Sequence, residues 1–80
     1  MRYATKSSLS KDEILDRAEE FFKKDGLVVT DGSLCRVCLE KDGGFVTVQV
    51  TEHDDREVII MTEGYDVKVK AFMKMLSKEG

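Results

Sequence analysis

Apolar and polar residues alternate along three segments in the middle of the chain, residues 34–40, 45–52 and 57–62. A period of two is typical of strands that bury one face. Asp31-Gly32 precedes the first segment and Asp42-Gly43 follows it, and Asp-Gly is a favoured pair in two-residue hairpin turns. With the short β-branched run at 27–30, the pattern predicts an antiparallel meander of three long strands preceded by a shorter one.

An amphipathic helix is predicted ahead of these strands. Ser10 and Glu13 have the spacing of a capping box. Apolar residues then recur at helical spacing from Ile14 to Phe22. Gly26 stands where a left-handed residue ends a helix, and Leu27 follows it as the Schellman motif prefers. These signals together predict a helix over residues 11–25.

A second helix is predicted after the strands. Gly64 ends the last strand and Asp66 is a suitable N-cap. Apolar residues recur at helical spacing from Tyr65 to Leu76. The alternation of Val67–Lys70 leaves a competing interpretation, in which these residues extend the sheet and the helix begins near residue 71.

The predicted turns assign one face of the sheet to the core. The Asp42-Gly43 turn places Val37 opposite Val48, and directly opposed residues share a face. A polar connection over residues 53–56 is expected to place Val50 opposite Ile59. The predicted inner residues are Val28, Cys35, Val37, Leu39, Val46, Val48, Val50, Ile59 and Met61.

Both helices are expected on this inner face, because that arrangement buries their apolar sides. The predicted fold is therefore α+β, a two-layer sandwich in the order α-β-β-β-β-α with an antiparallel sheet. One domain is expected over residues 10–80, preceded by a flexible arm over residues 1–9.

The opposite face of the predicted sheet carries apolar residues that a fully solvated face would lack. Contiguous exposed apolar patches commonly mark interfaces. The alternative is that these residues are scattered or covered by the N-terminal arm. The candidate interface residues are Phe45, Val58, Ile60, Leu34, Thr47 and Gln49.

Composition narrows the choice of partner and compartment. The chain has 80 residues, a formal net charge of −3 and two cysteines. An acidic chain is not expected to attract nucleic acid or anionic lipid as a whole. It has no apolar run of membrane-spanning length and no secretory signal, so we expect a cytoplasmic protein with reduced thiols and no membrane partner.

The candidate chemical motifs are weak. Cys35 and Cys38 have the spacing of redox and zinc sites, but within a strand they point to opposite faces. Cys35 is then expected in the core. His53 lies among carboxylates in a segment whose composition suits a solvated turn. We therefore predict no catalytic residue, metal or cofactor, and do not expect an enzyme.

These observations favour a small cytoplasmic interaction module without catalysis. It is expected to self-associate as a homodimer, or to dock another protein, through the outer sheet face or a sheet edge. The alternative is a small-ligand-binding domain or an accessory domain of an enzyme complex, with a site near Met61, Met73 and Cys35. Nucleic-acid binding is less favoured, because the basic stripe of Lys70, Lys74 and Lys78 lacks aromatic neighbours for stacking.

Overall fold

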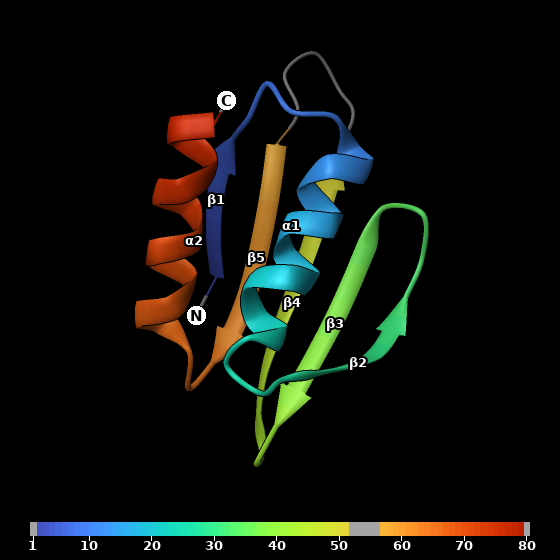
Figure 1. Cartoon of the computed structure of the whole chain (residues 1–80), viewed down its shortest axis with the longest axis vertical. Helices are drawn as coiled ribbons and strands as arrows, with labels where there is room; N and C mark the ends of the chain where they lie inside the picture. The colour runs from blue at the N-terminus through green and yellow to red at the C-terminus, as the bar shows by residue number, and fades with distance from the viewer. Residues whose placement is uncertain (1, 52–56, 80) are drawn as a thin grey trace.

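The computed structural model describes residues 2–51 and 57–79. Its elements are β1 (Arg2–Lys6), α1 (Lys11–Lys23), β2 (Val28–Gly32), β3 (Arg36–Lys41), β4 (Gly44–Thr51), β5 (Glu57–Glu63) and α2 (Asp66–Glu79). The strands form one antiparallel sheet in the order β1-β5-β4-β3-β2, and both helices lie on one face of it (Figure 1). The predicted α+β class and the order from α1 to α2 are confirmed.

The ends of α1 are stabilised as the sequence predicts. The backbone N–H of Glu13 donates to the side-chain oxygen of Ser10, which caps the helix. At the other end the N–H of Leu27 donates to the carbonyl of Phe22 and that of Gly26 to Lys23, the two bonds of a Schellman motif. Gly26 has a φ of +89°, which an L side chain rarely adopts.

Helix α2 begins at Asp66, so Val67–Lys70 is helical and does not extend the sheet. The N–H of Val69 donates to the carbonyl of Tyr65 at 2.9 Å. Val69, Phe72 and Leu76 are fully buried, as helical spacing requires for one face on the core. The ring centroids of Phe72 and Phe22 lie 5.4 Å apart, which joins the two helices.

The N-terminal segment differs from the expected flexible arm. Arg2–Lys6 forms β1, an edge strand that pairs antiparallel with β5 along its whole length. The hydroxyl of Tyr3 also donates to Asp66 Oδ2 at 2.6 Å, which ties β1 to the start of α2. This hydrogen bond, with smaller contributions from partial burial and the charge of Asp66, raises the pKa of Tyr3 above its ordinary value of 10.0.

The hairpin of β3 and β4 has the predicted register. Val37 pairs with Val48 and Leu39 with Val46, and all four side chains are buried. Asp42 and Gly43 both have positive φ, at 50° and 83°, as a type I′ turn requires.

The hairpin of β4 and β5 is shifted by one residue from the prediction. Val48 pairs with Ile60, and Val50 pairs with Val58. Because side chains alternate along a strand, this shift sends Val58 and Ile60 into the core and turns Ile59 and Met61 outward. Thr51 pairs with Glu57, so the connection contains five residues, whereas the predicted register required an even number.

The hairpin of β2 and β3 also differs from the prediction. The chain reverses after Asp31-Gly32, where the N–H of Ser33 donates to the carbonyl of Arg36. A β-bulge between Val29 and Asp31 shifts the pairing along β2. Val28 consequently lies on the outer face and is 62% exposed.

The core lies between the sheet and the two helices. Of the nine predicted inner strand residues, Val37, Leu39, Val46, Val48 and Val50 are buried. The prediction was wrong for Val28, Cys35, Ile59 and Met61, which are exposed or half-buried. Val58, Ile60 and Thr62 complete the inner face, and the Thr62 hydroxyl donates to the carbonyl of Phe45 at 2.8 Å.

Candidate protein-interaction surface

The face of the sheet away from α1 and α2 is covered by no helix or strand among the described residues (Figure 1). The register assigns to it every second residue of each strand. The residues of this outer face include Arg2, Ala4, Lys6, Val28, Arg36, Cys38, Glu40, Phe45, Thr47, Gln49, Thr51, Glu57, Ile59, Met61 and Glu63.

Apolar side chains lie on β4 and β5 of the outer face, with Ile59 and Met61 near its middle and Phe45 toward one end. Met61 pairs with Thr47, and Ile59 pairs with Gln49. Phe45 is two residues along β4 from Thr47 and therefore lies diagonally across from Met61. Met61 is 46% exposed, and Ile59 and Phe45 are half-buried. The apolar part of this face therefore crosses neighbouring strands.

Charges of opposite sign lie toward opposite ends of this face. Glu40 and Glu63 flank Phe45 in the register at one end of the strands. Arg36 and Lys6 lie toward the other end, where Lys6 pairs across strands with Glu57. The end with Glu40 and Glu63 is therefore acidic, whereas Glu57 and Asp31 balance the basic side chains at the other end.

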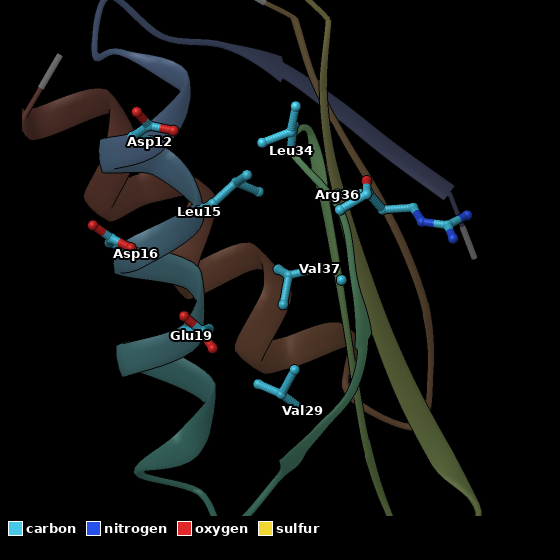
Figure 2. Close-up of a pocket in the computed structure, with 10 residues that line it drawn as sticks. Asp12, Leu15, Asp16, Glu19, Val29, Leu34, Arg36 and Val37 are labelled. Carbon is cyan, nitrogen blue, oxygen red and sulfur yellow. The ribbon is translucent and has the colours of Figure 1, made fainter.

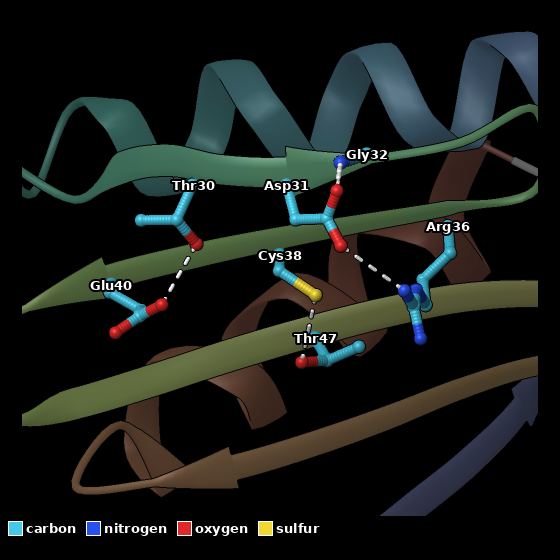
Figure 3. Close-up of polar contacts among 7 residues, drawn as sticks. All are labelled: Thr30, Asp31, Gly32, Arg36, Cys38, Glu40 and Thr47. Atoms are coloured by element: carbon cyan, nitrogen blue, oxygen red, sulfur yellow. Dashed lines mark hydrogen bonds and ion pairs between the residues drawn. The ribbon is translucent and has the colours of Figure 1, made fainter.

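Three polar contacts fix side chains on the β2 side of the outer face (Figure 3). Thr30 donates to Glu40 Oε2 at 2.9 Å, and Thr47 donates to the Cys38 sulfur at 3.5 Å. Arg36 binds Asp31 at 3.3 Å. These contacts order the rim of the face around its apolar middle.

Two predicted interface residues are placed wrongly by the sequence pattern. Val58 and Ile60 are completely buried on the inner face, so neither can contact a partner. The shifted β4–β5 register is the cause, since it exchanges them with Ile59 and Met61. The alternation assigned to residues 57–62 did not determine the inward side chains, because residues 58–61 are four consecutive apolar residues.

The other predicted interface residues are accessible to different degrees. Phe45 and Thr47 are half-buried and Gln49 is exposed, and all three lie on the outer face. Leu34 is 83% exposed but belongs to the loop between β2 and β3, where it faces a groove beside α1 (Figure 2). The structure therefore separates Leu34 from the other candidates.

The cysteines are free thiols in different environments. Cys38 is half-buried on the outer face. Cys35 is exposed just before β3, so the expectation that it lies in the core was wrong. Its exposure follows from the β2–β3 connection, which holds residues 33–35 outside the strands.

Among the described residues, no three His, Cys, Asp or Glu side chains gather as metal ligands would. His53 lies outside the described residues.

The alternative ligand site does not assemble in the described structure. Met61 is on the outer face and Cys35 is exposed, whereas Met73 is half-buried on α2. The three side chains therefore do not line one cavity between sheet and helices. The shifted register of β5 accounts for the displacement of Met61.

The basic stripe lies on the solvent side of α2. Lys70 and Lys74 are exposed, and the side chain of Lys78 lies outside the described part of the chain. Neighbouring Lys68 is engaged by Asp25 at 3.3 Å. Phe45 lies on the other face of the sheet and cannot stack beside this stripe. The strands also contain Tyr3, whose hydroxyl is engaged by Asp66 at the start of α2.

Comparison of the sequence with models of protein families and with curated proteins gives no match. Within the described residues, no helix is long and apolar enough to cross a membrane. We therefore infer function from the α+β fold and the surfaces that it presents.

Proposed function

We propose that this chain is a non-catalytic interaction module that binds a second copy of itself through the outer face of its sheet. The observation that carries the proposal is the position of Ile59, Met61 and Phe45 on a face that neither helix covers. Packing a second sheet on that face removes their apolar surface from water. A cytoplasmic location fits this function, because both cysteines are free thiols.

The size of the face suits a weak dimer. The sheet has five strands of five to eight residues. At about 4.8 Å between strands and about 3.3 Å per residue, the face covers roughly 490 Å² per copy. The total of about 980 Å² lies at the lower limit of roughly 1,000 Å² for a specific interface. We therefore expect dissociation in the micromolar range.

The charges of the outer face favour one arrangement of the two copies. A two-fold axis that lies in the interface and crosses the strands at Cys38 and Thr47 places Glu40 of each copy over Arg36 of its partner. This contact of opposite charges then forms twice, as an isologous interface requires.

Sedimentation velocity over a range of micromolar concentrations tests this proposal. The wild-type chain should approach the mass of a dimer as concentration rises. Met61→Glu should shift the equilibrium to monomer, because it buries a charge without a partner. Val67→Glu is the matched control, since Val67 is 80% exposed on α2, and should sediment like the wild type.

Two results would contradict the proposal. The first is a wild-type chain that stays monomeric over the whole concentration range, because no second copy then binds the outer face. Loss of the dimer in Val67→Glu, with Met61→Glu unchanged, would place the interface on the helical side. Thermal unfolding of each variant confirms that it is folded.

A further inference from the structure

A groove separates α1 from the hairpin of β2 and β3 (Figure 2). It encloses about 270 Å³. Leu15 reaches into it from α1, and Val29 and Val37 face it from the strands (Figure 2). Leu34 lines its upper end with a side chain that is 83% exposed. The bottom of the groove is therefore apolar.

The groove exists because the two helices cover the sheet unevenly. Helix α1 packs on β3 and β4, and α2 packs on β5. Strand β2 extends past α1 at the edge of the sheet (Figure 1). Helices pack about 8–10 Å apart, so the β2 side of α1 offers the position of a third helix in the same layer.

The helical wall of the groove is acidic. Asp12, Asp16 and Glu19 line it from α1 (Figure 2). Within the described residues, Asp12 and Asp16 take part in no ion pair. Arg36 also lines the groove but extends its guanidinium away from α1, toward Asp31 on the outer face. Glu19 is paired with Lys23 at 3.7 Å, so the negative charge available beside the apolar floor is that of Asp12 and Asp16.

We propose that this groove binds an amphipathic helix of a partner protein, with its apolar side on Leu15, Val29 and Leu34 and its lysine or arginine residues beside Asp12 and Asp16. The acidic wall from residue 12 to residue 19 is about 10 Å long, which matches two helical turns. Helix-in-groove recognition uses this combination of apolar anchors and flanking charge. The site is separate from the outer sheet face.

A foreign helix fits this groove better than α2 of a second copy. Helix α2 is basic at Lys70 and Lys74, but its large apolar residues are committed to its own core. Its exposed apolar side chains are Val67 and Ala71. A groove with four apolar lining residues is only partly filled by those two.

Fluorescence anisotropy with a labelled synthetic helix of leucine and lysine tests the proposal on the full chain. The wild type should bind it saturably, and a matched peptide with glutamate for lysine should not bind. Asp12→Asn/Asp16→Asn should weaken binding about 3- to 10-fold through the lost charge pairs. Leu34→Ser should weaken it by about tenfold through the lost apolar contact, without unfolding a side chain that is already exposed.

A control variant separates the groove from the net charge of the chain. Glu20→Gln/Asp42→Asn removes two charges at exposed positions that do not line this groove, and should bind like the wild type. Equal weakening by the control, or full binding by Leu34→Ser, would overturn the proposal. So would a wild-type dimer that Asp12→Asn/Asp16→Asn dissociates, because the occupant would then be a second copy.

Discussion

Two adjacent isoleucines of β5 lie in opposite environments. Ile60 is fully buried opposite Val48, and Ile59 is half-buried on the outer face opposite Gln49. Nothing in the two side chains distinguishes them. The pairing of β5 with β4 and β1 alone decides which one contacts the helices.

The stability cost of truncating these isoleucines measures the register directly. Ile60→Ala should lower the free energy of unfolding by about 2–4 kcal/mol, because it leaves a cavity in a packed core. Ile59→Ala should cost less than about 1 kcal/mol, since its side chain already contacts water. Urea unfolding of the two variants provides the measurement. A larger loss from Ile59→Ala would contradict the observed register.

Gly44 is required by a close approach of Tyr65. A Cβ at Gly44 would lie 2.6 Å from the Tyr65 ring and 2.8 Å from the carbonyl oxygen of Glu63. Because the second atom belongs to the backbone, Gly44→Ala should destabilise the fold by about 1–3 kcal/mol. Gly32→Ala is the matched control, since its Cβ meets only an ordinary contact at 3.7 Å. Comparable losses in both variants, measured by urea unfolding, would contradict this explanation.

At the scale of elements, pairing with β1 makes β5 an interior strand of the sheet and not an edge strand. With β1 paired on one side and β4 on the other, β5 is an interior strand of the sheet. The Tyr3–Asp66 hydrogen bond then joins the β1 edge to the first turn of α2. The N-terminal strand is thus bound to the rest of the fold by backbone pairing and by a side chain.

The Tyr3–Asp66 hydrogen bond makes the free energy of unfolding depend on pH in the alkaline range. The folded-state pKa of Tyr3 is raised above 10.0, so the neutral hydroxyl is favoured by folding. The hydrogen bond contributes fully to the free energy of unfolding below about pH 10, and this contribution is lost as the pH rises through the folded-state pKa of Tyr3. Urea unfolding of the wild type and Tyr3→Phe between neutral and alkaline pH checks this. The wild-type advantage should shrink on the alkaline side, and a constant difference would contradict the assignment.

The sequence predicted elements better than it predicted their pairing. Local signals at Ser10, Gly26 and Asp42-Gly43 gave both ends of α1 and the β3–β4 register, because each acts within a few residues. The β4–β5 register depends on the length of a polar connection and on the distant β1. Residues 58–61 give no alternation that could have decided it.

The candidate surface changed accordingly. The sequence indicated an apolar outer face and correctly placed Phe45, Thr47 and Gln49 on it. It placed Val58 and Ile60 on the outer face, where the structure has Ile59 and Met61. A one-residue shift in register turns every side chain of a strand to the opposite face. The groove beside α1 could not be predicted, since it depends on how far β2 extends past the helix.

At the scale of the whole molecule, one sheet face is buried by helices and the other faces outward. We infer that a second copy covers the outward face at Ile59 and Met61, and that the β2 side of α1 receives a partner helix. The two surfaces lie on opposite sides of the sheet. Both contacts can therefore form on one chain at the same time.

Isotope-filtered NMR on a mixture of labelled and unlabelled chains tests the proposed dimer most directly. We expect intermolecular contacts from the methyl groups of Met61 and Ile59 to outer-face protons of the other copy. Val67 of the same sample should give none, because it lies on α2. Intermolecular contacts at Val67, or none at Met61 and Ile59 under dimer-forming conditions, would contradict the account.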